Sequence, residues 1–228
     1  MIVAFETSAK SASVALHDGA RLLGESYQNT GLTHSQTLMV MAEDLLKQCG
    51  YGANAITHVA VAAGPGSFTG VRIGVAAAKG LAWGAQLPLY GVSTLEAMCR
   101  QVMLKGLAVC GCMDARRNQV YNAIFDHTGN RITEDRAISL EELKADLEKL
   151  SGPVILVGDG ARLAYNTLGL ENLILPPEQC QHQRASGVAQ VAAEQIAAGV
   201  VADAESLQPN YLRLSQAERE KLERQNKG

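Results

Sequence analysis

The sequence predicts an α/β fold in which two similar lobes face each other across a cleft. Short apolar runs, which are typical of buried strands, alternate with longer segments of helical periodicity. Acidic residues recur at one spacing, because Glu6 and Asp18 are twelve residues apart and so are Asp114 and Asp126. Both halves begin with strand, acidic turn, strand, tight turn and strand. This repetition indicates an internal duplication.

We expect the first lobe to span residues 1–104 and to be closed by a helix contributed by residues 184–214. The second lobe is expected at residues 105–214. Residues 215–228 are mostly charged and polar, so we expect a flexible tail there. A chain of 228 residues is long enough to bury a core in both lobes.

The first half reads as five strands and three helices. The strands are expected at residues 2–5, 12–16, 21–26, 59–63 and 88–92. The helices are expected at residues 34–49, 71–84 and 94–102. Thr33 can cap the first helix, and Ser93 with Glu96 forms a capping box at the third.

The second half repeats this alternation. Strands are expected at residues 107–113, 120–125, 154–157 and 173–175. Helices are expected at residues 140–150, directly after 158–161, and at 188–201. Ser139 and Glu142 form a second capping box. Residues 209–214 read as an extended closing segment.

Composition and charge limit the classes of function. The formal net charge is −3, so the molecule as a whole offers no basic field to a nucleic acid, and contact with RNA would need a local patch or a partner. The five cysteines have no framework spacing, which favours free thiols in a reducing cytoplasm. No apolar segment is long enough for a membrane span, and we expect no export signal.

A glycine-rich turn joins the strand at 59–63 to the helix at 71–84. Free amides at a helix N-terminus favour anions, so the turn could hold a phosphate. However, Gly64, Gly66 and Gly70 give G-x-G-x-x-x-G rather than the dinucleotide spacing, and no Gly-Lys-Ser/Thr follows. A purely structural turn is the simpler interpretation.

Two acids end corresponding strands and are the credible catalytic candidates. In a phosphoryl-transfer cleft, Glu6 and Asp114 would hold Mg²⁺ or orient a nucleophile. As structural residues they would cap turns or pair with a nearby arginine. Gly158 and Gly160 could form a nucleotide-binding turn, or only the entry to a helix. The histidines show no metal-ligand spacing, so we expect no metal and no cofactor.

The helices at 34–49 and 71–84 have unusually wide apolar faces. A stripe beginning at His34 continues through Leu38, Met41 and Leu45 at helical spacing. The second helix carries only two charges and many small residues, which would let another helix approach closely. Each face belongs either to the core or to a contact with a second chain.

Several phrases together resemble a known family over nearly the whole chain. The duplicated acidic turns resemble the superfamily of actin-like ATPases, sugar kinases and heat-shock ATPases. The phrases that narrow the resemblance to the TsaB (YeaZ) family are Phe5-Glu6-Thr7-Ser8, Gly64-Pro65-Gly66-Ser67-Phe68-Thr69-Gly70-Val71-Arg72-Ile73-Gly74, Gly91-Val92-Ser93-Thr94-Leu95, Met113-Asp114-Ala115-Arg116, Val157-Gly158-Asp159-Gly160-Ala161 and Pro209-Asn210-Tyr211-Leu212-Arg213.

The resemblance implies a non-catalytic scaffold of the bacterial cytoplasm, required for threonylcarbamoylation of adenosine 37 in tRNAs that read codons beginning with A. It implies a heterodimer with the transferase TsaD, recruitment of the ATPase TsaE, and a homodimer when TsaD is absent. Contact with tRNA would be indirect, through the complex. The expected partner interface comprises His34, Leu38, Met41, Leu45, Gly70, Gly74, Ala77 and Leu81.

Two departures from related patterns agree with a non-catalytic role. The two metal-binding histidines of TsaD correspond here to Thr94 and Met98, and a hydroxyl with a thioether does not replace two imidazoles around such a cation. The first acid, usually aspartate, is Glu6. The rival interpretation is an ATP-dependent small-molecule kinase or ATPase that uses Glu6 and Asp114. A third is a self-associating structural protein with no role in tRNA chemistry.

Overall fold

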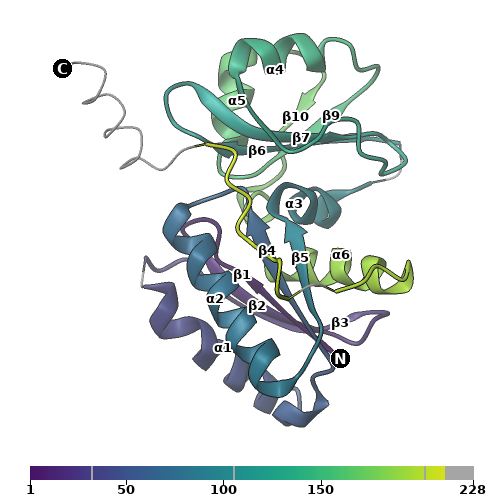
Figure 1. Cartoon of the computed structure of the whole chain (residues 1–228). Helices are drawn as coiled ribbons and strands as arrows, with labels where there is room; N and C mark the ends of the chain where they lie inside the picture. Colours follow the sequence, from purple (N-terminus) through teal and green to yellow (C-terminus); the bar gives the residue numbers. More distant parts are fainter. Residues whose placement is uncertain (32, 105, 203, 214–228) are drawn as a thin grey trace, which may run out of the picture.

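The computed structural model describes residues 1–31, 33–104, 106–202 and 204–213. The described chain forms two α/β lobes, one above the other in Figure 1. The tail expected at residues 215–228 lies outside the described residues. Within the described part of the chain, none of the helices combines the length and apolarity that crossing a membrane requires.

The first lobe is built on a five-stranded sheet with the order β3-β2-β1-β4-β5. Its strands are β1 (Ile2–Glu6), β2 (Ala12–His17), β3 (Leu22–Gln28), β4 (His58–Gly64) and β5 (Leu89–Ser93). The central strand β1 pairs antiparallel with β2 and parallel with β4. Because β1 is covered on both faces, all five of its residues are buried, as its continuous apolar run predicts.

The second lobe repeats this sheet strand for strand. Its strands are β6 (Ala108–Asp114), β7 (Gln119–Phe125), β8 (Arg136–Ser139), β9 (Val154–Val157) and β10 (Leu173–Ile174). They have the order β10-β9-β6-β7-β8, and β6 pairs antiparallel with β7 and parallel with β9. The prediction of two similar lobes is therefore confirmed.

Three helices follow the strands of each half in the same order. They are α1 (His34–Gln48), α2 (Phe68–Ala85), α3 (Thr94–Val102), α4 (Leu140–Leu147), α5 (Ala161–Leu168) and α6 (Ala185–Ala197). Short 3₁₀ turns occur at η1 (Ala53–Ala55) and η2 (Glu178–Cys180). The capping box of Ser139 and Glu142 is complete, whereas Thr33 makes no side-chain cap bond. Helix α2 begins before the expected residue because Ser67 caps it.

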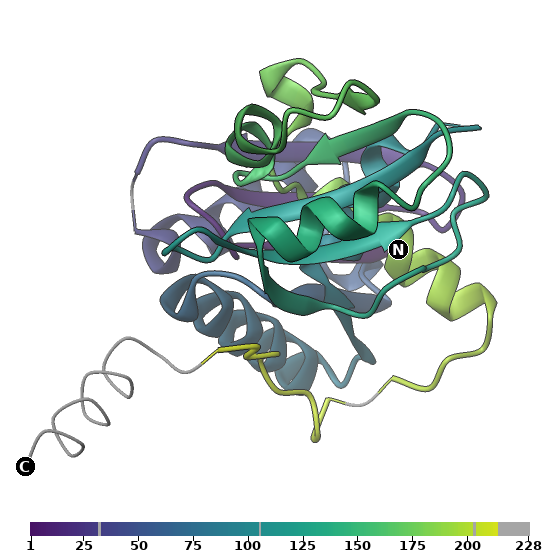
Figure 2. The ribbon, with the colours of Figure 1, turned by 90° about the horizontal axis from the view of Figure 1, so that it is seen from above.

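The helices and sheets alternate in layers (Figures 1 and 2). Helices α1 and α2 cover the outer face of the first sheet, and α4 and α5 cover the second. Between the sheets, α6 packs on the first and α3 on the second, so the closing helix of each lobe comes from the other half. The exact lobe boundaries stay a prediction.

Small residues make this middle layer possible. A Cβ atom at Gly187 of α6 would collide with the carbonyl oxygen of Ala97 of α3, so only glycine allows the two helices to approach this closely. The α6 face that meets the first sheet consists mainly of alanine and valine. The two helices therefore pack directly against each other between the sheets.

Three cysteines are buried in and beside β6. The sulfur atoms of Cys110 and Cys112 lie 3.5 Å apart on one face of the strand, as their spacing predicts. Burial raises the pKa of the Cys99 thiol well above its ordinary value. The hydrogen bond with Cys110, followed by burial, does the same to Cys112. The raised pKa values favour the protonated thiols of Cys99 and Cys112, which act as packing groups.

Two glycines of α2 offer a matched test of this packing. A Cβ atom at Gly70 would collide with the carbonyl oxygen of Thr7, whereas one at Gly80 meets no heavy atom within 4 Å. We expect Gly70→Ala to lower the free energy of unfolding by about 2 kcal/mol or more. We expect Gly80→Ala to raise it by about 0.5–1 kcal/mol through helix propensity.

The measurement is urea denaturation of both variants at one protein concentration. Equal effects of the two substitutions would contradict the close approach of α2 to the turn after β1.

Candidate functional site

The turns that follow four strands face one another between the lobes. Strands β1 and β4 are parallel neighbours, and so are β6 and β9, so their carboxyl ends meet at one edge of each sheet. A cavity of about 440 Å³ lies between these edges. Its polar lining includes Ser8, Lys10, Ser67, Asp114, Arg116 and Asp159. This cleft is the first candidate site.

Of the two predicted catalytic acids, Glu6 does not line the cavity. Its side chain is buried, and Oε1 accepts a hydrogen bond from the Ser8 amide. Among the described residues, Oε2 has no hydrogen-bond partner. Burial is the largest influence on this carboxyl group and raises its pKa to about 7. A carboxyl group in this position cannot present two oxygens to a metal in the cleft.

Asp114 does line the cavity, but its carboxylate also organises the turn. Oδ1 accepts the amide hydrogen of Arg116 at 2.7 Å, and Oδ2 lies 3.6 Å from the Arg116 guanidinium. Each of the four repeated acids accepts a hydrogen bond from the backbone amide two residues later. The pairs are Glu6 with Ser8, Asp18 with Ala20, Asp114 with Arg116, and Asp126 with Thr128. The repeated spacing thus has a sufficient structural cause in turn formation.

The turn between β9 and α5 closes the cleft from the second lobe. Gly158 and Gly160 bring the backbone against Cys112 and Asp114, where side chains would collide. Their role toward a nucleotide stays a prediction. Asp159, which lies between them, is a cleft residue that the sequence reasoning missed. It accepts a bond from Gln183 at 3.3 Å, and burial raises its pKa.

Asp159 could have been found from topology. It follows the end of β9, which is the parallel neighbour of the strand that ends at Asp114. Because parallel strands present their carboxyl ends at one edge, the two acids had to lie close together.

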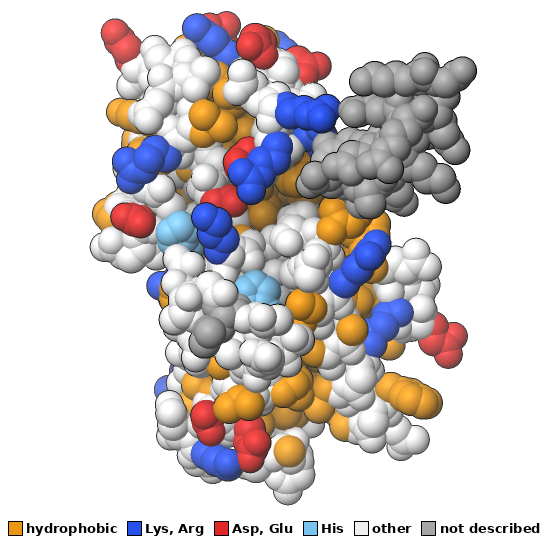
Figure 3. Space-filling view, turned by 90° about the vertical axis from the view of Figure 1, so that its left-hand side faces the viewer, with side chains coloured by type: hydrophobic (Ala, Val, Ile, Leu, Met, Phe, Trp, Pro, Cys, Tyr) orange, Lys and Arg blue, Asp and Glu red, His pale blue; other side chains and the backbone are white. Residues whose placement is uncertain are grey.

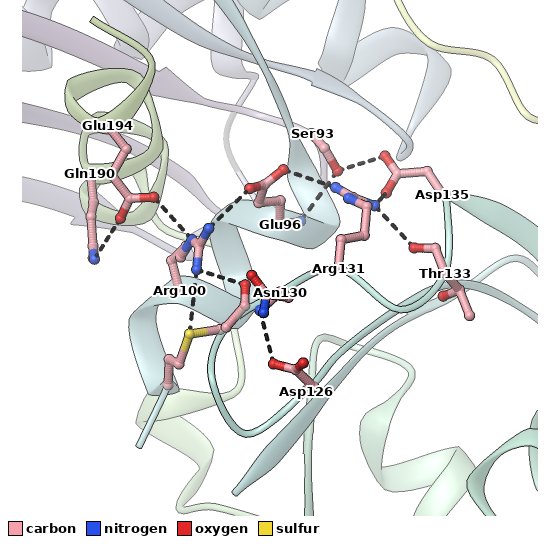
Figure 4. Close-up of polar contacts among 12 residues, drawn as sticks. Ser93, Glu96, Arg100, Asp126, Asn130, Arg131, Thr133, Asp135, Gln190 and Glu194 are labelled. Atoms are coloured by element: carbon pink, nitrogen blue, oxygen red, sulfur yellow. Dashed lines mark hydrogen bonds and ion pairs between the residues drawn. The ribbon is translucent and has the colours of Figure 1, made fainter. Parts of the chain in front are cut away.

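A polar network joins the lobes beside α3 (Figure 4). Glu96 of α3 pairs with Arg131 at 2.9 Å and with Arg100 at 3.5 Å. Arg131 also pairs with Asp135 at 2.7 Å, and Arg100 pairs with Glu194 of α6 at 3.2 Å. Both guanidinium groups lie over the ring of Phe125. The network therefore connects α3, α6 and the chain before β8.

The second candidate site is the surface of α1 and α2. Leu38, Met41 and Leu45 are between 1% and 5% exposed, and Gly70 and Gly74 are also buried. These side chains pack inside the first lobe and contribute to its core. Whether any of them also meets a partner stays a prediction. The stripe faces the sheet because it is the most apolar face of α1.

The other predicted interface residues are only half-buried. Ala77 and Leu81 pack partly against the core. The Nε2 atom of His34 lies 2.9 Å from the carbonyl oxygen of Ala9, so this ring anchors the start of α1. Whether any of the three meets a partner stays a prediction.

The exposed apolar surface of α1 and α2 comes from residues next to the predicted interface residues (Figure 3). On α1, Met39 and Val40 are 44% and 56% exposed. On α2, Ala76 and Gly80 are exposed in the same row as Trp83, whose side chain is 88% exposed. Helical periodicity reveals an apolar stripe, but it does not reveal which additional residues remain uncovered after that stripe meets the sheet.

Comparison with known families matches residues 28–221 to the family described as TsaD: tRNA N6-adenosine threonylcarbamoyltransferase. The chain is also similar to proteins named tRNA threonylcarbamoyladenosine biosynthesis protein TsaB. The Escherichia coli protein is 35% identical over 93% of this chain and 94% of its own length. The Bacillus subtilis protein is 31% identical over 98% and 99%.

Solved structures agree with these relatives. A Pseudomonas aeruginosa protein described as similar to peptidase YEAZ has a TM-score of 0.79 and 27% identity, covering 93% of this chain and 99% of its own. The activator of 2-hydroxyisocaproyl-CoA dehydratase from Clostridium difficile has a TM-score of 0.50 and 12% identity, covering 87% of this chain and 96% of its own. This second likeness concerns the fold alone. The predicted fold class, an α/β fold of two similar lobes, is confirmed.

The buried Glu6 carboxyl group gives a pH-dependent prediction. Its pKa of about 7 in the folded chain exceeds its ordinary value of 4.5, so folding favours the protonated form. The group therefore destabilises the fold as pH rises from about 4.5 through 7. The Glu6→Gln variant keeps a side-chain oxygen that can accept the hydrogen bond from the Ser8 amide. We expect its free energy of unfolding to rise relative to that of the parent over this pH window, by about 3 kcal/mol in total.

Urea denaturation between pH 4.5 and 8 measures this difference. Glu43→Gln, on the exposed face of α1, is the control. Parallel stability profiles of Glu6→Gln and the parent would show that the Glu6 pKa is not raised.

Proposed function

Because this chain belongs to the TsaB (YeaZ) family of tRNA threonylcarbamoyladenosine biosynthesis proteins, we propose that it serves this pathway as a binding subunit rather than as the transferase. In this proposal it pairs with a TsaD-type transferase, and the pair recruits the ATPase TsaE in the bacterial cytoplasm. Without the transferase, the same surface pairs with a second copy of this chain.

The observation that carries the proposal is the uncovered face of α2. An isolated chain gains nothing by exposing Trp83 almost completely, and buried tryptophan side chains are frequent energetic centres of protein interfaces. Ala76 and Gly80 in the same row leave room for the backbone of another helix. With α1 beside α2, two helices from each partner would form a four-helix contact.

A transferase of related sequence is the favoured partner. The similarity to the TsaD family extends through α1, α2 and the second lobe. A chain related to its partner has corresponding helices, so the two can meet through equivalent faces as in a pseudo-symmetric dimer. Exchange between a homodimer and this heterodimer then needs only one surface.

The residues at the catalytic positions support a non-catalytic role. Thr94 and Met98, which correspond to the metal-binding histidines of TsaD, are 0% and 2% exposed and pack inside this chain. Glu6 is buried as well, and the Asp114 carboxylate caps its own turn. The rival function, an ATPase using Glu6 and Asp114, needs both acids to face a bound phosphate.

A charge on α2 tests the proposed contact. We expect Ala76→Glu to weaken binding of the transferase at least about tenfold, because a carboxylate would be buried between helices without a partner. Ala197→Glu, an equivalent change at the exposed end of α6, is the matched control. Sedimentation velocity of each variant, alone and mixed with the transferase, measures both the homodimer and the heterodimer.

ATP turnover by the purified chain separates the two functions on the same samples. The binding-subunit proposal expects no turnover without TsaE and TsaD. Turnover by the chain alone, lost in Asp114→Ala, would establish the rival enzyme instead. If the Ala76→Glu variant binds the transferase normally, α2 is not part of the contact.

A further inference from the structure

The cations of the chain differ in how they are neutralised. Many pair with a carboxylate inside the same lobe, as Lys47 does with Glu43 and Arg136 does with Asp146. Within the described ranges, six have no carboxylate partner: Lys10, Arg72, Lys79, Lys144, Arg162 and Arg213. Arg116 has only the 3.6 Å contact with Asp114, and its side chain is 81% exposed.

Four of these weakly neutralised cations gather at the mouth of the cleft, and we call them the cationic rim: Lys10, Arg72, Arg116 and Arg213. Lys10 and Arg116 line the same cavity from opposite lobes. The Arg213 guanidinium donates to the carbonyl oxygen of Ala115, directly before Arg116. Figure 3 shows lysine and arginine side chains around the indentation between the lobes.

Aromatic stacking connects Arg72 to this rim. Phe68, which lines the cleft, stacks on Tyr211 with ring centroids 4.4 Å apart and planes within 6°. Arg72 lies against both rings and donates to the Tyr211 hydroxyl at 2.7 Å. The closing segment therefore holds Arg72 and Arg213 in place on one side of the cleft.

The backbone that carries Arg116 is held in a costly conformation. Arg116, Arg117 and Asn118 have φ angles of 67°, 56° and 56°, which side-chain-bearing residues rarely adopt. The carbonyl oxygen of Asn118 accepts the amide of Leu140, which helps to fix the loop. Such strain persists where surrounding contacts impose it, and here the strained turn carries Arg116, which lines the cleft.

Two acids line the same cavity as the rim and offset part of its charge. Asp159 is largely buried and bonded to Gln183, while Asp114 accepts the Arg116 amide within its turn. Glu205 is exposed, but it lies beside Lys79, farther along α2. The four cations of the rim outnumber these two acids, so the balance of charge at the cleft mouth is positive, although the whole chain carries a net charge of −3.

We propose that the cationic rim binds phosphate groups of the tRNA backbone directly. This inference rests on the proposed function and departs from the expectation that tRNA is reached only through the partner. A polyanion suits unneutralised guanidinium and ammonium groups, whereas the apolar row on α2 suits a protein. The two surfaces can then act together, with one holding the transferase and the other its RNA substrate.

The test measures tRNA binding by fluorescence anisotropy as a function of salt concentration. The double variant Lys10→Gln with Arg116→Gln removes two exposed rim charges. The control, Lys144→Gln with Arg162→Gln, removes two similarly unpaired charges from the helices of the second lobe. Each protein is measured alone and in complex with the transferase, and heterodimer formation is followed by sedimentation.

Each phosphate contact contributes about sixfold to affinity near 0.1 M salt, so we expect the rim variant to bind tRNA about 30-fold more weakly. The slope of log affinity against log salt should fall by about two, while the control changes neither quantity. The heterodimer should form normally with both variants.

Unchanged affinity and slope in the rim variant would overturn the inference. Loss of the heterodimer without a change in the tRNA salt slope would also overturn it, because the rim would then contact protein. If the parent chain fails to bind the transferase, the proposed function fails. The measurements on the isolated chain would still decide whether the rim binds RNA.

Discussion

The whole structure depends on the packing of α3 against α6 between the two sheets. Each helix covers the sheet of the opposite half, so neither lobe has a complete core without the other. The contact requires Gly187 against Ala97, and the ion-pair network of Glu96 with two arginines surrounds it. This middle layer determines the shape of the cleft between the lobes.

The duplication explains why acidic turns recur at the carboxyl ends of the strands, where each carboxylate organises its own turn. The same turn recurs after β1 and β6, and in each the carboxylate accepts an amide two residues later. Burial of Glu6 removes one acid from the cleft, where Asp114 and Asp159 remain beside the four cations of the rim. The features that suit binding lie on the outside: an apolar row on α2 and a positive rim above it.

The sequence alone predicted most of the helices and strands and the internal duplication. Buried strands and the twelve-residue spacing of the acids can each be recognised within a short stretch of sequence. It did not locate β8, an edge strand whose residues are all half-buried and which contains no apolar run. It could not show that Leu38 and Leu45 lie in the core of the first lobe, since periodicity alone does not tell a face packed on a sheet from one packed on a second chain. Asp159 and the Phe68–Tyr211 stack depend on contacts between distant segments, which local patterns do not contain.

The exchange of closing helices also governs how the chain acquires its structure during synthesis. The inner face of the first sheet, including Ala4, Ala60 and Ala62, leaves the ribosome early, but its cover, α6, ends only at Ala197. This protein therefore cannot fold vectorially, because its first lobe cannot be completed before the second lobe has been synthesised. A nascent chain arrested after the second sheet would present two incomplete cores to chaperones and proteases, and premature termination would cost the first lobe as well as the last helix.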